Sequence, residues 1–230
     1  MDIRSLFRQL MPAQPCFLCG AMNRAGLCCN ACAADLPHLS GPRCRLCAQP
    51  LPTDGVCGHC LRHAPAFDRT LAAFRYAFPL DRLVQALKFE EQLLLAPFLG
   101  DALARCVDET PDCLLALPLH ADRLRARAFN QSQLLADHLS RALHLPVRRD
   151  VVQRVRNTLP QSSLPWQARK RNMRQAFALQ PGAGVHGMHI AIVDDVMTTG
   201  ATLDALAHVL KQGGARKVSA WVVARTLARA

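Results

Sequence analysis

Two carboxylates and a group of hydroxyls lie close together near the end of this 230-residue chain. Residues 190–193 read Ile-Ala-Ile-Val, Asp194 and Asp195 follow at once, and residues 198–202 read Thr-Thr-Gly-Ala-Thr. A short apolar run of this kind is typical of a strand buried on both faces inside a parallel sheet. The spacing of the Leu residues after position 202 predicts a helix. The segment therefore predicts a strand, a turn and a helix, with polar groups where the strand ends and in the turn.

The turn has the features of a phosphate site. A helix that begins directly after it leaves backbone N–H groups unpaired and carries the positive end of the helix dipole. Gly200 lets the backbone approach an anion closely, and the Thr hydroxyls add donors. Asp194 and Asp195 suit the two hydroxyls of a ribose, or a magnesium ion held through water. These groups predict a site for ribose 5-phosphate, because the glycine spacing fits neither the P-loop nor the dinucleotide fingerprint.

Nine of the eleven cysteines fall within the first 60 residues, and eight of them form Cys-x-x-Cys pairs. The pairs are Cys16 and Cys19, Cys29 and Cys32, Cys44 and Cys47, and Cys57 and Cys60. Each pair fits a tight turn that presents two thiolates to one tetrahedral metal. In a chain without a signal peptide, the pairs therefore predict zinc ribbons rather than disulfides.

The cysteine spacing leaves alternatives open. Four pairs can fill two sites, so the number of zinc ions and the pairs that share each ion are not determined. Cys28 makes the register of the neighbouring pair ambiguous, and His59 or His63 could replace a thiolate. A cluster that packs without metal is the plain alternative.

Elements of an α/β fold must position these groups. Besides residues 190–193, the apolar pattern predicts strands over residues 71–76, 114–117, 151–155, 176–179 and 218–223. It predicts helices over residues 81–88, 93–107 and 130–143 and from residue 203 to the cap at Gly213-Gly214. This alternation predicts a mostly parallel sheet with helices on both faces. We expect residues 1–66 to form a leader and metal module and residues 67–230 to form the α/β domain.

The net charge of +11 is concentrated in the middle of the chain, where residues 114–175 hold 12 Lys and Arg against 3 Asp and Glu. Such a density of Arg indicates recognition of a pyrophosphate or a nucleic-acid backbone, with a solvated basic face as the plain alternative. The first residues lack the apolar core of a signal peptide, and no apolar run reaches the roughly 20 residues that span a bilayer. We therefore expect a cytoplasmic protein without membrane insertion.

Motifs along the chain resemble those of one protein family. Residues 190–202 resemble the phosphoribosyl-pyrophosphate loop of the type I phosphoribosyltransferases. The strand predicted over residues 114–117 is followed by Pro118-Leu119-His120 and then by Arg123-x-x-x-Arg127-Ala128-Phe129-Asn130-Gln131. Later come Arg154-x-Arg156-x-Thr158-x-x-Gln161-x-x-Leu164 and Arg169-x-x-Asn172. With the cysteine pairs, these motifs resemble the ComF family, bacterial proteins that carry a double zinc ribbon on a phosphoribosyltransferase-like domain and include members linked to DNA uptake in competence.

The resemblance implies a role for each motif, and the eight paired cysteines would bind structural zinc. Phosphoribosyl pyrophosphate, with magnesium, would bind to Asp194, Asp195, Thr198, Thr199, Gly200, Ala201 and Thr202. A pyrophosphate loop and a flexible loop over residues 156–172 would contribute Pro118, Leu119, His120, Arg123, Arg127, Arg156 and Arg169. Arg binds phosphate oxygens bidentately, and closure of the flexible loop would exclude water from the reactive centre.

Three residues in or beside these motifs have a plainer interpretation. Ala128 stands where the family usually has Gly, so a positive φ at this position would cost on the order of 1 kcal/mol. Asn130 would contribute to the ligand site or simply cap the helix that follows it. Lys88 is similar to a family position, but a lone Lys at a helix end is expected to be solvated.

Two classes of function follow. The first is an enzyme, a glycosyltransferase that moves a phosphoribosyl group to an acceptor that the sequence does not identify, with no residue marked as the general base. The second is a non-catalytic, DNA-binding accessory protein whose phosphoribosyl site is a sensor or a backbone clamp. The zinc ribbons and the Arg residues favour the second class, but few aromatic residues lie among them to stack on bases. The expected partners are phosphoribosyl pyrophosphate, single-stranded DNA and other competence proteins.

Overall fold

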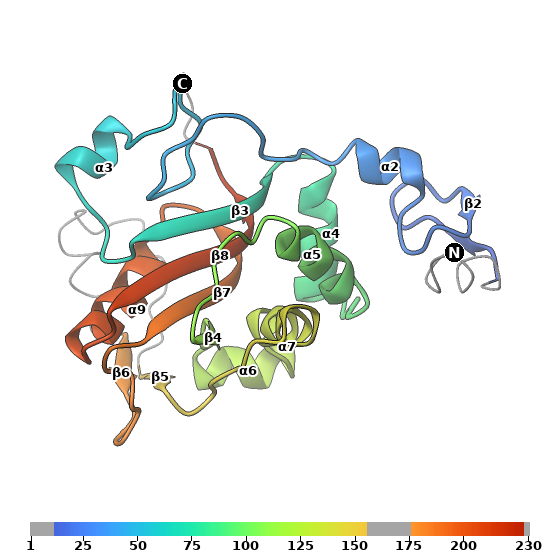
Figure 1. Cartoon of the computed structure of the whole chain (residues 1–230). Coiled ribbons are helices and arrows are strands. Elements are labelled where there is room, and N and C mark those ends of the chain that lie inside the picture. The colour runs from blue at the N-terminus through green and yellow to red at the C-terminus, as the bar shows by residue number, and fades with distance from the viewer. Residues whose placement is uncertain (1–11, 156–175, 228–230) are drawn as a thin grey trace, which may run out of the picture.

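The computed structural model describes residues 12–155 and 176–227, and its centre is a four-stranded parallel sheet (Figure 1). The strand order is β3-β8-β7-β4. The strands are β3 (Arg69–Arg75), β8 (Lys217–Arg225), β7 (His189–Met197) and β4 (Cys113–Ala116). Nearly every residue of β7 and β8 is buried, as expected for central strands covered on both faces. The predicted parallel sheet of an α/β fold is confirmed.

Helices cover both faces of the sheet. The helices are α4 (Leu80–Phe89), α5 (Leu95–Ala104), α6 (Ala121–Arg127), α7 (Gln131–Leu143) and α9 (Ala201–Gln212). Alternate residues of β7 face opposite layers: Val193 packs in the cluster with α4, α5 and α7, whereas Ile192 packs in the cluster with α9. Figure 1 shows α9 on one side of the sheet and α5 and α7 on the other. Within the described residues, every helix is too short or too polar to cross a membrane.

Two short strands lie outside the main sheet. β5 (Val152–Arg154) and β6 (Phe177–Leu179) pair with one another in antiparallel fashion, and β6 packs against α9. The strand predicted over residues 176–179 is present as β6, but it pairs with β5 and does not join the main sheet. The open edge of β4 instead pairs with Val147, because Leu114 N–H donates to the carbonyl of Pro146 at 2.8 Å.

The cysteine-rich region forms two small ribbons. Its elements are β1 (Gln14–Pro15), β2 (Met22–Asn23), α2 (Asn30–Ala34) and α3 (Gly58–Arg62). We call residues 13–36 the first ribbon and residues 42–63 the second ribbon. Figure 1 shows the first ribbon beyond α4, on the side of the molecule that carries α5 and α7, and the second ribbon over β3. The boundary expected at residues 66 and 67 stays a prediction.

The segment that leads into the second ribbon covers the outer edge of β3. Leu39 N–H donates to the carbonyl of Ala73 at 2.9 Å, and Arg75 N–H donates to the carbonyl of Pro37 at 2.8 Å. Thr70 N–H donates to Arg45 in the ribbon itself at 3.2 Å. An exposed edge strand is a template for unwanted pairing between chains, so this cover protects the sheet.

Candidate functional site

The two aspartates lie inside β7. The sequence predicted that the strand stops at residue 193, but the strand continues to Met197 because Asp194 keeps its register with Val222 of β8. Asp194 and Asp195 are 8% and 3% exposed, respectively. The carboxylates are therefore held at the carboxyl end of the sheet on a rigid element rather than on a loop.

Each carboxylate has one side-chain partner from a helix. Ser132 Oγ, in the first turn of α7, donates to Asp194 Oδ1 at 2.8 Å. Lys88 Nζ, in the last turn of α4, lies 2.9 Å from Asp195 Oδ1. The expectation that Lys88 is simply solvated was therefore wrong. Asp195 Oδ2 is buried and has no hydrogen-bond partner among the described residues.

Burial affects the pKa of Asp194. Burial, together with the charge of the neighbouring Asp195, raises the pKa of Asp194 from 3.8 to about 7. The hydrogen bond from Ser132 and the charge of Lys88 oppose this rise without cancelling it. With its pKa near 7, the Asp194 carboxyl can donate as well as accept a hydrogen bond.

The turn after β7 leads directly into α9. Gly200 has a φ of 83° and is the N-cap of α9. The conformation favours glycine, whereas a Cβ at this position would meet only the flexible end of Met197, Cε at 2.5 Å, which can shift. Thr198 and Thr199 are exposed, and Thr199 Oγ1 accepts a hydrogen bond from Ala201 N–H at 3.3 Å. Exposed hydroxyls beside the start of the 12-residue helix α9 are the arrangement expected for a phosphate site.

A second helix begins beside the acid pair. Leu117 N–H donates to the carbonyl of Val193 at 2.9 Å, so Pro118, Leu119 and His120 leave β4 next to β7. Residues 118–120 form a loop, as the sequence predicted, and His120 then caps the short helix α6, its Nδ1 accepting from Asp122 N–H at 3.2 Å. Arg123 and Arg127 therefore lie on a helix.

The link between α6 and α7 explains two motif residues. Ala128 has a φ of 63°, so the strain expected for this replacement of glycine is present. Asn130 caps α7, since its Oδ1 accepts from Ser132 N–H at 3.0 Å, and the plainer interpretation of this residue is confirmed. Its Nδ2 also donates to the carbonyl of Leu117 at 3.1 Å, which ties the start of α7 to the end of β4.

Two arginines lie near enough to the acid pair to interact with its charge. Arg127 places its guanidinium 5.0 Å from the centre of the Phe89 ring and donates to Gln131 Oε1 at 2.7 Å. Burial lowers the pKa of Arg127, while the charge of Asp195 opposes the shift. Arg154, on β5, is also buried. Burial lowers its pKa, and the charge of Asp194 opposes this shift. Arg156 and Arg169 lie outside the described residues.

Sequence reasoning missed the contacts of Lys88, Ser132 and Arg225. Arg225 ends the apolar strand β8 and donates to the carbonyls of Met197 and Thr198 under the turn. An Arg at the end of a run of apolar residues is the signal that could have marked it, because a charge is rarely buried without a specific partner. The contacts of the other two depend on helices distant in sequence.

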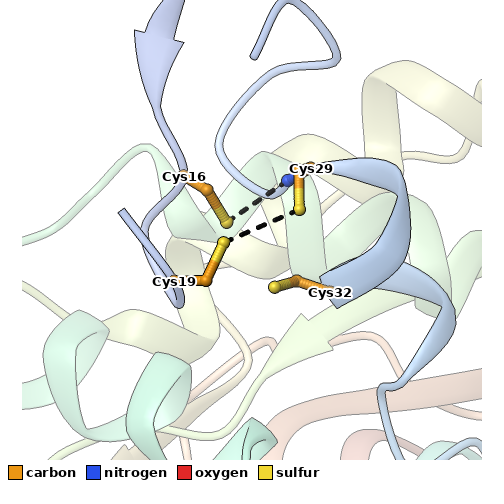
Figure 2. A group of neighbouring side chains, drawn as sticks. All are labelled: Cys16, Cys19, Cys29 and Cys32. Atoms are coloured by element: carbon orange, nitrogen blue, oxygen red, sulfur yellow. Dashed lines mark hydrogen bonds between the residues drawn. The ribbon is translucent and has the colours of Figure 1, made fainter. Parts of the chain in front are cut away.

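The eight paired cysteines form two groups of four. The first group is Cys16, Cys19, Cys29 and Cys32, and the second is Cys44, Cys47, Cys57 and Cys60. In each group the four Sγ atoms lie within 4.8 Å of one another. Figure 2 shows the four sulfur atoms of the first group facing a common centre. The structure thus determines which pairs belong together, and neither Cys28 nor a histidine joins a group.

The thiol geometry fits tetrahedral zinc. Zinc–sulfur bonds of about 2.3 Å place two thiolates about 3.8 Å apart. The Sγ atoms of Cys19 and Cys29 are 3.9 Å apart, and those of Cys47 and Cys57 are 3.7 Å apart. Burial would raise the pKa of Cys16, but backbone hydrogen bonds, the largest from Cys29, outweigh burial and lower the pKa to about 6. Each ribbon therefore has the ligands and the backbone donors of a zinc site.

Comparisons with known proteins agree with this arrangement. The double zinc ribbon domain matches residues 6–61, and the phosphoribosyl transferase domain matches residues 130–230. Competence protein F of Haemophilus influenzae is 31% identical over 207 residues, which cover 86% of this chain and 90% of that protein.

The chain belongs to the ComF family.

A second relative of this ComF-family protein is the DNA utilization protein YhgH of Escherichia coli O6:H1, 37% identical over 227 residues. That match covers 92% of this chain and 97% of the relative. Among solved structures, adenine phosphoribosyltransferase from Leishmania tarentolae aligns with a TM-score of 0.39 at 13% identity, over 71% of this chain and 77% of that chain. In the ComF-family chain, the acid pair, the α9 turn and the start of α7 meet at the carboxyl end of the sheet.

Proposed function

We propose that this ComF-family protein binds phosphoribosyl pyrophosphate at the carboxyl end of its sheet. The 5-phosphate binds to the turn over residues 198–202, where backbone N–H groups and exposed Thr hydroxyls meet the positive end of α9. The ribose hydroxyls bind to Asp194 and Asp195. The observation that supports this assignment best is a buried carboxylate pair fixed directly before a glycine-capped helix, with one carboxylate oxygen unpaired among the described residues.

The diphosphate is assigned to the opposite side of the acid pair. Pro118, Leu119 and His120 supply its backbone, and Arg123 and Arg127 on α6 supply positive charge. Asp195 Oδ2 and Asp194 are the groups that would hold a magnesium ion through water, and that ion would neutralise charge on the diphosphate. The flexible-loop residues Arg156 and Arg169 are proposed as further diphosphate contacts.

For the reaction, we propose transfer of the phosphoribosyl group to an acceptor. The bond between ribose C1 and the pyrophosphate oxygen breaks, pyrophosphate leaves, and an acceptor nucleophile forms the new bond at C1. The protein contributes by fixing the ribose, by balancing the charge that moves onto pyrophosphate, and by excluding water. Phe89, 71% exposed and beside Arg127, is the aromatic surface next to the site that an acceptor could contact.

A second proposed function is binding of single-stranded DNA by the basic middle of the chain. Two observations favour it. The relatives are named as a competence protein and a DNA utilization protein, and residues 114–175 hold 12 Lys and Arg against 3 Asp and Glu. Arg148 pairs with Asp150 at 2.9 Å and Arg149 pairs with Asp137 at 2.5 Å, so each of these two arginines already has an acidic partner. On α6, Arg125 also pairs with Asp122, so the candidate DNA contacts are Arg123 and Arg127, nearer the acid pair. Other competence proteins as partners, and a cytoplasmic location, stay predictions.

Thermal unfolding of the full-length, zinc-loaded protein tests the proposed ligand. A ligand that binds only the folded state raises the unfolding temperature, and the rise grows with ligand concentration. Phosphoribosyl pyrophosphate with magnesium should raise it more than ribose 5-phosphate or pyrophosphate alone, because the intact ligand occupies both halves of the site. Equal, negligible shifts with all three compounds would remove the proposed site.

Release of pyrophosphate tests the proposed reaction. The acceptors to compare are a panel of nucleobases, single-stranded DNA and water. An enzyme releases pyrophosphate with at least one acceptor, and Asp195→Asn abolishes the release. If binding occurs without release for every acceptor, the sensor or clamp is the better account. Loss of DNA binding with salt then measures the number of phosphate contacts, since log K falls by about 0.7 per contact for single strands.

A further inference from the structure

Arg225 connects the phosphate turn to the second ribbon. It is the last residue of β8, lies in register with Met197 at the end of β7, and is only 5% exposed. Its Nη1 donates to the carbonyls of Met197 at 3.0 Å, Thr226 at 2.7 Å and Thr198. Its Nε donates to the carbonyl of Cys47, in the second ribbon, at 2.8 Å. One buried guanidinium therefore joins the ends of β7 and β8, the turn after β7, and the second ribbon at Cys47.

The bonds of Arg225 orient the turn. In a trans peptide the C=O and the next N–H point in opposite directions. Because the carbonyls of Met197 and Thr198 point toward Arg225, the N–H groups of Thr198 and Thr199 point away from it. A charged donor also polarises the peptides that it bonds and strengthens these N–H donors. Arg225 thus fixes the donors that the proposed phosphate site uses.

The segment around Cys47 in the second ribbon is held beside the turn by further contacts. Gln49 Nε2 donates to the carbonyl of Thr226 at 3.1 Å. Thr70 Oγ1 donates to the carbonyl of Leu46 at 2.5 Å and lies 3.9 Å from Met197 Sδ. The second ribbon is therefore hydrogen-bonded to Thr226, directly after β8, and to Thr70 of β3, which contacts Met197.

The first ribbon, which is described over its whole length, has no hydrogen bond to the turn and instead packs through Cys16, Cys28 and Leu36 in the apolar cluster that contains α4, α5 and α7. The hydrogen bonds of its described residues 13–35 all end within the ribbon, as for Cys29 N–H to Cys16 Sγ at 3.3 Å. It extends from the opposite side of the molecule, away from α9 (Figure 1). The two ribbons have the same cysteine spacing but different contacts with the turn. Substitutions in the first ribbon can therefore serve as the control for substitutions in the second.

We propose that Arg225 is a positioning residue for the phosphate turn, and that the second ribbon, unlike the first, is part of the ligand site. Metal bound to Cys44, Cys47, Cys57 and Cys60 holds the Cys47 carbonyl in place, this carbonyl holds Arg225, and Arg225 holds the turn. Loss of the second metal then lowers phosphate affinity, whereas loss of the first leaves it unchanged. The statement about affinity rests on the proposed binding of phosphoribosyl pyrophosphate, but the statement about the turn does not.

The first experiment measures amide hydrogen exchange of residues 197–202 in the full-length protein without ligand. Arg225→Lys keeps the positive charge and all eight thiolates but loses the forked donors. It should speed exchange in the turn by about 10-fold or more, since the turn loses several charge-assisted bonds. Zinc content and the circular dichroism spectrum should stay as in the wild type. Wild-type exchange rates in a folded Arg225→Lys protein would overturn the proposal.

The second experiment compares the two ribbons by calorimetry with phosphoribosyl pyrophosphate and magnesium. Cys44→Ser with Cys47→Ser should weaken binding by about 10-fold or more, as should Arg225→Lys, whereas Cys16→Ser with Cys19→Ser should bind like the wild type. Equal losses from both ribbons would contradict a specific role for the second. If the second pair of substitutions prevents folding, Arg225→Lys decides alone. If the wild type binds nothing, the proposed function fails, and hydrogen exchange still tests the role of Arg225.

Discussion

Lys88 Nζ lies 2.9 Å from Asp195 Oδ1 and joins the last turn of α4 to the carboxyl end of β7. This ion pair fixes one member of the acid pair from a helix that lies more than 100 residues earlier in the chain. Ser132 fixes the other member from α7. The acid pair is therefore held from two helices of the same layer, while the turn beyond it belongs to α9 on the other face. The site lies where both layers meet the sheet.

Replacement of Lys88 should destabilise the fold more than loss of an ordinary surface pair. Lys88→Met leaves the buried carboxylate of Asp195 without its partner, and we expect the free energy of unfolding to fall by about 1–3 kcal/mol. Lys211→Met is the matched control, since Lys211 pairs with the more exposed Asp68 at 2.7 Å and should cost less than about 1 kcal/mol. Urea unfolding of the zinc-loaded proteins measures both. Equal costs would show that burial of Asp195 does not matter.

Ala128→Gly should stabilise the protein. The φ of 63° at Ala128 costs energy for any residue with a Cβ, so glycine should raise the free energy of unfolding by about 0.5–1 kcal/mol. Ala142→Gly, at an exposed position in α7, should have the opposite sign and cost about 1 kcal/mol. A destabilised Ala128→Gly protein would mean that the link between α6 and α7 does not have this conformation in solution.

The pattern of buried apolar residues was enough to predict β7, β8, α7 and α9, because periodicity reports on burial. It was not enough for α6, a seven-residue helix with no buried residue and therefore no apolar stripe. The polar start of α7 was predictable as a cap from Asn130 alone, since a cap depends on residues two positions apart.

Contacts between distant segments could not be predicted from one sequence. Lys88 looks like a solvated helix end until α4 is placed beside β7, and Arg225 looks like the polar end of a strand until the second ribbon is placed against it. The same holds for β5 and β6, whose mutual pairing depends on where the chain returns. The cysteine groups were predictable as ligands from local spacing, but their pairing required the fold.

Glu109 should make stability depend on pH in acid. Burial would raise its pKa, but hydrogen bonds from Lys217, Ser219 and Trp221 outweigh burial and lower it from 4.5 to about 2. A depressed pKa in the folded state stabilises the fold above pH 4.5, and this contribution is lost as pH falls from about 4.5 to about 2.

Glu109→Gln measures this contribution. Wild type should be more stable than the variant by about 1–3 kcal/mol at pH 7, and the difference should shrink toward zero at about pH 2. Loss of zinc in acid affects both proteins, so the difference between them isolates Glu109. Chemical denaturation over this pH range provides the measurement. A difference that stays constant with pH would contradict the assigned hydrogen bonds.

Two zinc ions should bind to each chain, one for each ribbon. Native mass spectrometry of the reduced wild type should find both ions, because each group of four thiols has the spacing of a tetrahedral site. Cys16→Ser with Cys19→Ser should lose one ion and make the first ribbon sensitive to protease, since so small a segment depends on its metal. Intact wild type with no zinc would refute both sites.

The measurement that tests the central claim most directly is calorimetry of full-length protein with phosphoribosyl pyrophosphate and magnesium. The wild type should bind, and the Asp195→Ala/Thr199→Ala double variant should bind more weakly by about 1–3 kcal/mol through loss of charge-assisted hydrogen bonds. Asp108→Ala removes an exposed carboxylate that pairs with Arg69, at the other end of the sheet, and should bind like the wild type. Equal affinities of the wild type and the double variant, or no binding by the wild type, would contradict the assignment of β7 and the α9 turn to this ligand.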